Sequence, residues 1–184
     1  AGGAITAKGN DTAIKTQLTP ELQRYNLATD EDPAAGFRAS IALTNLAKPE
    51  LTWPLWAGAF TALFGPTDFA MHLTGRTGTF KSEAISLFQS HYGAGMDARH
   101  LPASWSSTAN ALEALAFLAK SAPITIDDFV PGGTSWQVRA YQATADKIIR
   151  AQGNQAGRAR LTDTSSLQQT MYPRGLIYST GEDT

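Results

Sequence analysis

The feature that most constrains the fold is a glycine-containing loop between an apolar strand and a helix. Residues 69–74 are short and apolar enough to form a buried strand, and residues 83–91 have the apolar spacing of a helix. The loop between them continues the strand without a break and leads straight into the helix. A strand, a glycine-rich turn and a helix in this order predict an α/β fold with a mainly parallel sheet flanked by helices.

The loop fits the pattern of a phosphate-binding loop (P-loop), in which a glycine, four residues and Gly-Lys-Ser/Thr join a strand to a helix. Gly75 is the first glycine, Lys81 is the lysine that would contact the β- and γ-phosphates, and Ser82 is the hydroxyl that would ligate Mg²⁺. Backbone N–H groups and the helix N-terminus would supply further positive charge. We therefore expect ATP to bind the residues Gly75, Arg76, Thr77, Gly78, Thr79, Phe80, Lys81 and Ser82.

Phe80 departs from this pattern, because it stands where the consensus has its second glycine. A bulky side chain beside the β-phosphate would weaken or reshape nucleotide binding. Two other interpretations therefore stay open: an ordinary strand-to-helix turn with an incidental Lys-Ser, and a degenerate loop that no longer binds nucleotide. The strand before the loop and the helix after it favour the phosphate-binding interpretation.

A second strand, over residues 123–129, carries two adjacent acids near its end. A parallel strand beside the loop would deliver Asp127 to the shell of Mg²⁺, as a Walker B element does. Asp128 would then orient or deprotonate the attacking water. Aspartate is also common in turns at strand ends, so the two acids alone do not distinguish a metal site from an ordinary turn. Together with Lys81-Ser82 it favours a catalytic Mg-ATP site.

The remaining pattern completes the predicted architecture. We expect helices over 35–46, 54–64, 109–120 and 136–151, the second of them apolar nearly all round and buried, and a further strand over 175–181. Short strands at 2–5 and 14–18 and a helix start at Thr19-Pro20 are also predicted. We assign 33–184 to a P-loop ATPase core that is incomplete at its C-terminus. Residues 1–32 form an N-terminal segment or the tail of an upstream domain.

The charge distribution leaves the partner open. The net charge is −1, but residues 129–181 hold six cations against two acids. This basic block either faces a polyanion or consists of solvated helix and loop charges. There is no cysteine and no run near the roughly 18 apolar residues that a membrane span needs, and we expect no signal peptide. We therefore expect a cytoplasmic protein without a membrane partner.

Several ordered motifs resemble a poorly characterised group of bacterial ATPases from phages, plasmids and integrative elements, often associated with primase modules. The similarity runs from about Pro33 onward and rests on the segments 73–83, 101–113, 126–131, 150–154 and 173–183. More remotely, the motif order is similar to that of superfamily-3 helicases. This resemblance implies that Arg158 and Arg160 belong to a DNA-facing loop and that Thr180 is a catalytic sensor of the γ-phosphate, although Gly181 and Glu182 follow where those helicases usually show an asparagine.

Other polar and aromatic residues have weaker functional signals. Asn110 and Glu113 fit a solvated helix face or part of a helix cap better than an active site, and Arg174 is either an arginine finger for a neighbouring subunit or a surface residue. The histidines lack metal-ligand spacing, and His72 is expected to be a buried, hydrogen-bonded residue of the core. The tryptophans are expected to serve packing, not base stacking; they are Trp53, Trp56, Trp105 and Trp136.

These observations predict Mg-ATP hydrolysis coupled to remodelling of, or translocation along, single- or double-stranded DNA. The full-length protein would form a homo-oligomeric ring, and the cofactors would be ATP and Mg²⁺. A regulatory ATPase switch that does not bind nucleic acid and a degenerate, non-catalytic module are the alternatives.

Overall fold

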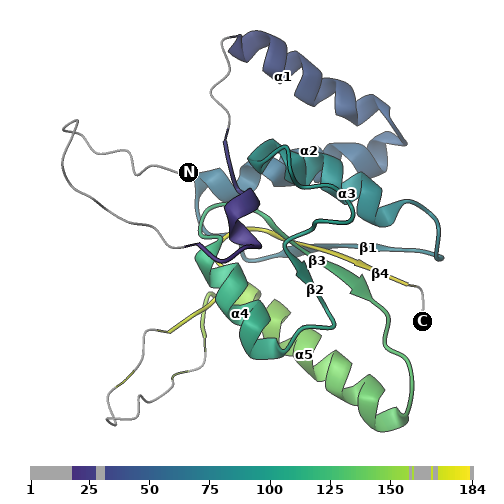
Figure 1. The fold of residues 1–184 in the computed structure, drawn as a ribbon, viewed down its shortest axis with the longest axis vertical. Coiled ribbons are helices and arrows are strands. Elements are labelled where there is room, and N and C mark those ends of the chain that lie inside the picture. Colours follow the sequence, from purple (N-terminus) through teal and green to yellow (C-terminus); the bar gives the residue numbers. More distant parts are fainter. Residues whose placement is uncertain (1–17, 28–31, 158, 160–166, 168–169, 183–184) are drawn as a thin grey trace.

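The computed structural model describes residues 18–27, 32–157, 159, 167 and 170–182. Within them the chain forms a parallel four-stranded sheet in the order β1-β4-β3-β2, with helices on both faces (Figure 1). The mixed α/β architecture predicted from the sequence is confirmed. The strands are β1 (Ala70–Thr74), β2 (Ala103–Ser104), β3 (Ile124–Phe129) and β4 (Ile177–Gly181).

The helices divide between the two faces of the sheet. The α-helices are α1 (Pro33–Ala42), α2 (Pro49–Thr61), α3 (Lys81–Gln89), α4 (Ala109–Leu118) and α5 (Ser135–Gly153). Single 3₁₀ turns are η1 (Leu22–Arg24), η2 (Leu43–Asn45), η3 (Ala62–Phe64) and η4 (Ser90–Tyr92). Helices α2 and α3 cover one face of the sheet and α4 and α5 the other, while α1 lies outside α2 (Figure 1).

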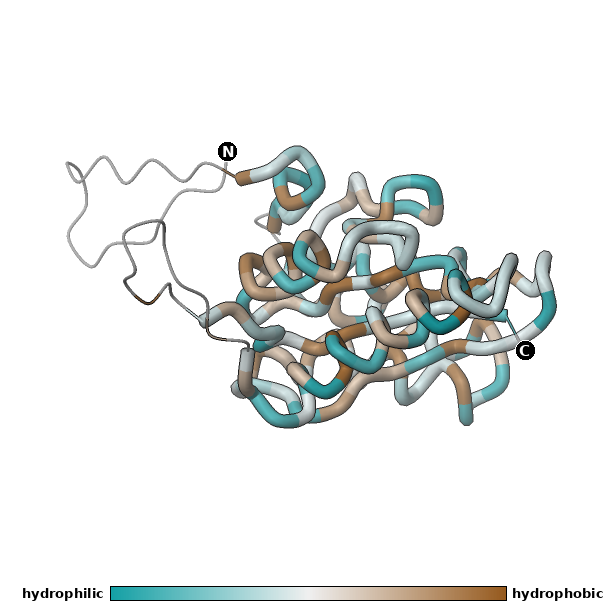
Figure 2. The backbone as a smooth tube through the Cα atoms, turned by 90° about the horizontal axis from the view of Figure 1, so that it is seen from below, coloured by the Kyte–Doolittle hydropathy of each residue, from teal (hydrophilic) through white to brown (hydrophobic). Residues whose placement is uncertain are grey.

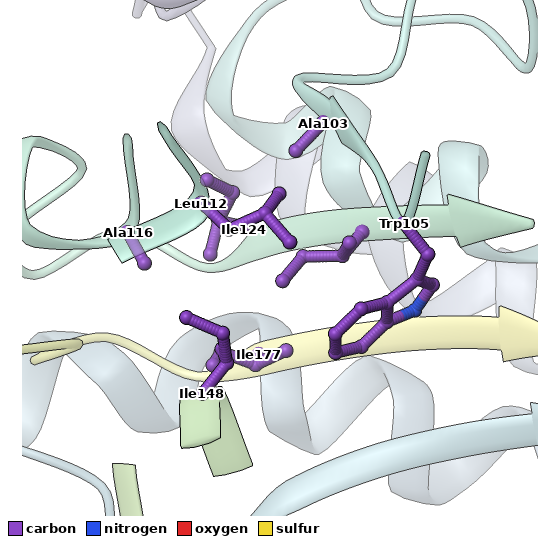
Figure 3. Packing of buried hydrophobic residues seen from close by; sticks show 8 residues of the cluster. Ala103, Trp105, Leu112, Ala116, Ile124, Ile148 and Ile177 are labelled. Atoms are coloured by element: carbon purple, nitrogen blue, oxygen red, sulfur yellow. The ribbon is translucent and has the colours of Figure 1, made fainter. Parts of the chain in front are cut away.

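Each face of the sheet has its own apolar core, and hydrophobic segments concentrate in the interior of the molecule (Figure 2). On the α4–α5 face the strands bury a cluster that includes Trp105, Leu112, Ile124, Ile148 and Ile177 (Figure 3). On the α2–α3 face the cluster comprises Leu55, Ala59, Ala62, Ile85, Phe88, Leu176 and Tyr178. Alternate residues of β3 and β4 therefore face opposite layers, as strand geometry requires.

Helix starts follow local sequence chemistry. The Thr108 side chain accepts a hydrogen bond from the Ala111 N–H and so forms the N-cap of α4. Thr134 and Gln137 form a capping box at the start of α5. Both caps lie just beyond the carboxyl ends of neighbouring strands, and they fix where these helices leave the sheet edge.

Three features differ from the sequence predictions. β2 was not predicted, because a two-residue strand has no periodicity and exists only through its pairing with β3. α2 starts at Pro49 and not at Pro54, and Trp53 on its outer side is 47% exposed, so the helix is not buried all round. β1 is less buried than predicted because, among the described residues, a strand flanks it only on the β4 side.

The described N-terminal residues pack on the same body as the sheet. Leu22 is buried, and the Tyr25 hydroxyl donates to the carbonyl of Pro123 at 2.7 Å, just before β3. The Asn26 N–H donates to the carbonyl of Tyr92. The strand predicted at 2–5, and that at 14–18 apart from Leu18, lie outside the described residues. In the described part of the chain no helix is both long and apolar enough to cross a membrane.

Candidate functional site

The glycine-containing loop connects the end of β1 to the first residue of α3. Gly75 and Gly78 have φ angles of 157° and 78°, in the region that favours glycine. Lys81 begins α3 and Ser82 follows in its first turn. The sequence thus produces a tight turn whose end is a helix N-terminus, where backbone N–H groups are available to an anion.

Phe80 is the N-cap residue of α3 and has a left-handed backbone, with φ 60° and ψ 28°. A side chain in this conformation costs roughly 1–2 kcal/mol, because Cβ approaches the following carbonyl oxygen. The ring is 75% exposed and therefore gains little from burial. The loop thus takes at this position the backbone that the consensus glycine would adopt without strain.

Lys81 folds back over its own loop. Its Nζ donates to the carbonyls of Gly75 and Arg76, each at 2.8 Å. The Thr79 hydroxyl donates to the carbonyl of Arg76 as well, also at 2.8 Å. These bonds hold the ammonium group at the loop, where phosphate oxygens can replace the two carbonyls as its acceptors.

A hydrogen-bonded network joins the loop to both central strands. The Ser82 hydroxyl donates to Oδ1 of Asp127 at 2.7 Å. The Thr180 hydroxyl donates to the same oxygen, and it accepts the backbone N–H of Asp128 at 2.9 Å. α3, β3 and β4 therefore bring these side chains together, as expected where parallel strands end at one edge of a sheet.

This donor set fits a magnesium ion. Its oxygens come from the Ser82 hydroxyl and the Asp127 carboxylate, which are ligand types that hold Mg²⁺ in P-loop proteins. Among the described residues, no group of at least three His, Cys, Asp or Glu side chains could hold a metal ion alone. Mg²⁺ is usually held by one or two carboxylates together with substrate phosphates and water, so the small set is appropriate.

A cleft of about 270 Å³ lies over the loop. It is lined by loop residues 77–82 together with Glu83, Ala98, Asp128, Thr180, Gly181 and Glu182. A wider hollow of about 570 Å³ adjoins it, shares Ala98 and is lined by Asp127, α4 and the segment before β2. The loop residues and Lys81 line the smaller cleft and not the wider hollow.

Glu182 is a residue of this site that the sequence reasoning did not single out. It lines the cleft, its carboxylate accepts a hydrogen bond from the Thr77 hydroxyl, and its N–H donates to the carbonyl of Phe129 at 3.1 Å. Its position directly after β4 was the available signal, since residues following parallel strands gather at one edge. Glu182 thus ties the tip of the loop to the end of β4.

The solvated position predicted for Glu113 is wrong. It is 2% exposed, and Lys147 of α5 contacts its carboxylate at 3.4 Å and the Asn110 side chain at 3.2 Å. Its position on the α5-facing side of α4 accounts for this burial. Arg174 is half-buried and precedes β4, so it lies at the end of the sheet opposite to the loop of its own chain.

His72 is hydrogen-bonded but not buried. Its Nδ1 lies 2.9 Å from the Ser179 hydroxyl, which also accepts the indole N–H of Trp105. The predicted hydrogen bond is confirmed and the predicted core position is wrong, because β1 lies at the side of the sheet. Partial burial lowers the pKa of His72 below its ordinary value.

The tryptophans differ in exposure. Trp105 is buried in the core, as expected for packing, and Trp56 lies in an aromatic cluster with Trp53 and Phe60. Trp136, however, is 76% exposed at the start of α5, so the packing interpretation is wrong for it. Trp136 lies in the first turn of α5, before the residues Tyr141, Ala145 and Ile148 that pack against the sheet.

The basic block is partly neutralised. Lys147 contacts Glu113, and Arg150 pairs with Asp146 one turn away at 2.7 Å. Arg158 and Arg160, predicted to face DNA, lie outside the described residues. Arg150 fits the interpretation as a solvated helix charge, because its ion pair is exposed, whereas Lys147 serves an ion pair with a buried acid.

Comparisons with known proteins support the family and the fold. A family model described as "Domain of unknown function (DUF927)" matches residues 50–170. No curated protein matches the chain. The fold is similar to a solved structure described as "SCCmec type IV Cch - active helicase", with a TM-score of 0.51 and 20% sequence identity. That similarity covers 88% of this chain and 29% of the helicase, so the chain spans less than a third of that protein.

Proposed function

The chain belongs to the DUF927 family, and we propose that it binds Mg-ATP at residues 75–82 and hydrolyses it. The observation that carries the proposal is the hydrogen bond between the loop hydroxyl of Ser82 and the carboxylate of Asp127. A loop lysine, a hydroxyl and a strand-end carboxylate at one sheet edge are the parts that a P-loop ATPase needs.

Each residue has a definite task in this mechanism. Backbone N–H groups of the loop and the N-terminus of α3 bind the β- and γ-phosphates, and Lys81 exchanges its two carbonyl acceptors for phosphate oxygens. Ser82 and Asp127 would hold Mg²⁺, which supplies positive charge to the phosphate oxygens when bound. Thr180 keeps Asp127 oriented through the hydroxyl hydrogen bond.

Asp128 acts on the water. Its carboxylate orients the water and accepts a proton as the water oxygen attacks the γ-phosphorus. The bond between that phosphorus and the β–γ bridging oxygen breaks, and its electrons remain on ADP. Phosphate and ADP leave, and the proton passes from Asp128 to solvent.

Coupling to DNA is the second part of the proposal. Its support is the fold similarity to a protein described as an active helicase, together with the resemblance of the motif order to helicases. In this proposal the full-length protein forms a ring in the cytoplasm, and Arg158 and Arg160 contact the DNA backbone. Phosphate contacts of this kind predict binding that weakens steeply with salt.

A degenerate module is the competing function, and Phe80 is the observation that favours it. Its exposed ring belongs to the strained N-cap of α3, and Phe80 lines the cleft that would hold the phosphates. A module of this kind would keep the fold but neither bind nor hydrolyse ATP. A regulatory switch would hydrolyse ATP without any response to DNA.

Phosphate release from Mg-ATP, measured with and without single-stranded DNA, separates these functions. The proposal predicts turnover that Lys81→Ala abolishes and that Asp128→Asn reduces to a small residual rate, and stimulation by DNA that declines with salt. Turnover without stimulation would indicate the switch. Absence of turnover and of ATP binding in the wild type would indicate the degenerate module and overturn the proposal.

A further inference from the structure

The two acids at the end of β3 are held by an irregularity in the sheet. On β3, Ile126 pairs with Ser179, but the next paired residue is Phe129, opposite Gly181. β3 therefore uses Asp127 and Asp128 where β4 uses the single residue Thr180, which is the definition of a β-bulge. Bulges of this kind are uncommon between parallel strands.

The bulge changes which way Asp128 faces. In a regular strand, successive side chains point to opposite faces. Thr125 and Asp127 bond to side chains of α3, and Ile126 packs in the core against α4 and α5. A regular strand would therefore direct residue 128 toward the α5 layer. Instead Asp128 has a left-handed backbone with φ 67°, is exposed and lines the phosphate cleft.

This backbone conformation costs energy and needs partners to hold it. The Asp128 N–H donates to the Thr180 hydroxyl at 2.9 Å, and the Asp128 carbonyl accepts the Tyr141 hydroxyl of α5 at 3.1 Å. The Tyr141 ring packs against Phe129, with ring centroids 5.4 Å apart. Both backbone polar groups of the bulged residue are thus bound from neighbouring elements.

Besides burial, the negative charge of Asp128 affects the pKa of Tyr141. Partial burial and, secondly, the negative charge of Asp128 raise the pKa of Tyr141 above its ordinary value. The phenol therefore stays protonated and remains a donor to the carbonyl at neutral pH.

We propose that Tyr141 is a positioning residue, which with Thr180 clamps the bulge so that Asp128 lines the phosphate cleft while Asp127 stays bonded to Ser82 and Thr180 of the same cleft. The inference rests on the proposed ATPase function and extends it to a residue that lies outside the loop and the acidic strand. Tyr141 acts only through Asp128 and contacts no phosphate. Thr180 in this account orients both acids, in addition to any contact with nucleotide.

The test compares Tyr141→Phe with Tyr92→Phe in the full chain. Tyr92 is the matched control, because its hydroxyl also donates to a backbone carbonyl, that of Ala59 at 2.6 Å, and Tyr92 does not line the cleft. Tyr141→Phe is expected to lower kcat about tenfold or more while KM for Mg-ATP stays within about twofold, since it disturbs a group that acts in the transition state. Tyr92→Phe is expected to leave both constants unchanged.

A double-mutant cycle then separates positioning from general loosening of the fold. In the Asp128→Asn background, Tyr141→Phe is expected to lower the residual kcat no further, because there is no carboxylate left to position. An equal loss in both backgrounds, or an unchanged kcat in Tyr141→Phe, would overturn the inference while leaving the ATPase itself established.

If the wild type has no turnover, the ATPase proposal is refuted but the positioning role of Tyr141 is not. Amide hydrogen exchange still tests that role. Loss of the Tyr141 hydroxyl is expected to accelerate exchange at Asp128 and Phe129, whereas Tyr92→Phe leaves these amides protected. Equal protection in both variants would show that Tyr141 does not hold the bulge.

Discussion

Replacing Phe80 by glycine is expected to stabilise the protein relative to alanine at the same position. The backbone at Phe80 has φ 60°, where a Cβ atom costs about 1–2 kcal/mol. Glycine loses about 0.4–1 kcal/mol more than alanine through the entropy of the unfolded chain. The midpoints of these two ranges differ by about 0.8 kcal/mol, so the free energy of unfolding of Phe80→Gly is expected to exceed that of Phe80→Ala by about this amount.

Urea unfolding of wild type, Phe80→Ala and Phe80→Gly at one temperature measures this difference. Both variants remove the exposed ring, so loss of its contacts cancels and the backbone term remains. At an ordinary helical position the order is reversed, because alanine is then about 0.5–1 kcal/mol better than glycine. Finding Phe80→Ala more stable than Phe80→Gly would refute the left-handed N-cap.

The remaining predictions concern residues around the site. Lys147→Met is expected to lower the free energy of unfolding by about 1–3 kcal/mol, because it removes the ion pair that Lys147 makes with buried Glu113; near-wild-type stability in chemical unfolding would contradict this, and the double variant with Glu113→Leu should recover most of the loss. Because the folded pKa of His72 is lowered, its contribution to stability is complete above the unfolded pKa of about 6.5 and declines as pH falls below it. His72→Asn should therefore lose less stability between pH 7.5 and 5 than the wild type, and an identical pH dependence would count against the lowered pKa. Gly181→Ala is expected to unfold at lower denaturant concentration, because a Cβ would lie 2.8 Å from the carbonyl oxygen of Phe129. An unchanged unfolding midpoint would show that the end of β4 can move away from Phe129 at no cost in stability, which contradicts the prediction.

Much of the site's placement could be predicted from local pattern alone. Lys81-Ser82 and Asp127 each follow or end an apolar strand, and parallel strands finish at one edge of a sheet. The direct Ser82–Asp127 bond is a consequence of that rule. Their roles in ATP chemistry remain predictions.

Other features depend on information that periodicity does not contain. The extra residue of the β3 bulge is visible only in the register against β4, so its effect on Asp128 could not be predicted. Glu113 is buried because α5 packs over it, a tertiary contact unrelated to its helical propensity. β2 is too short to leave a pattern, and the exposure of Trp136 follows from the first turn of α5 having little cover.

The most direct test of the central claim is a thermal unfolding experiment with and without Mg-ATP on wild type, Lys81→Ala and the exposed-lysine control Lys48→Ala. At about 100 times the dissociation constant, ATP should add about 2.7 kcal/mol of stability to the wild type and the control. For a protein of this size that corresponds to a rise in Tm of about 5–10 °C. The account predicts that Lys81→Ala loses this rise. A wild type that shows no rise at millimolar Mg-ATP, or a rise that Lys81→Ala retains, would contradict it.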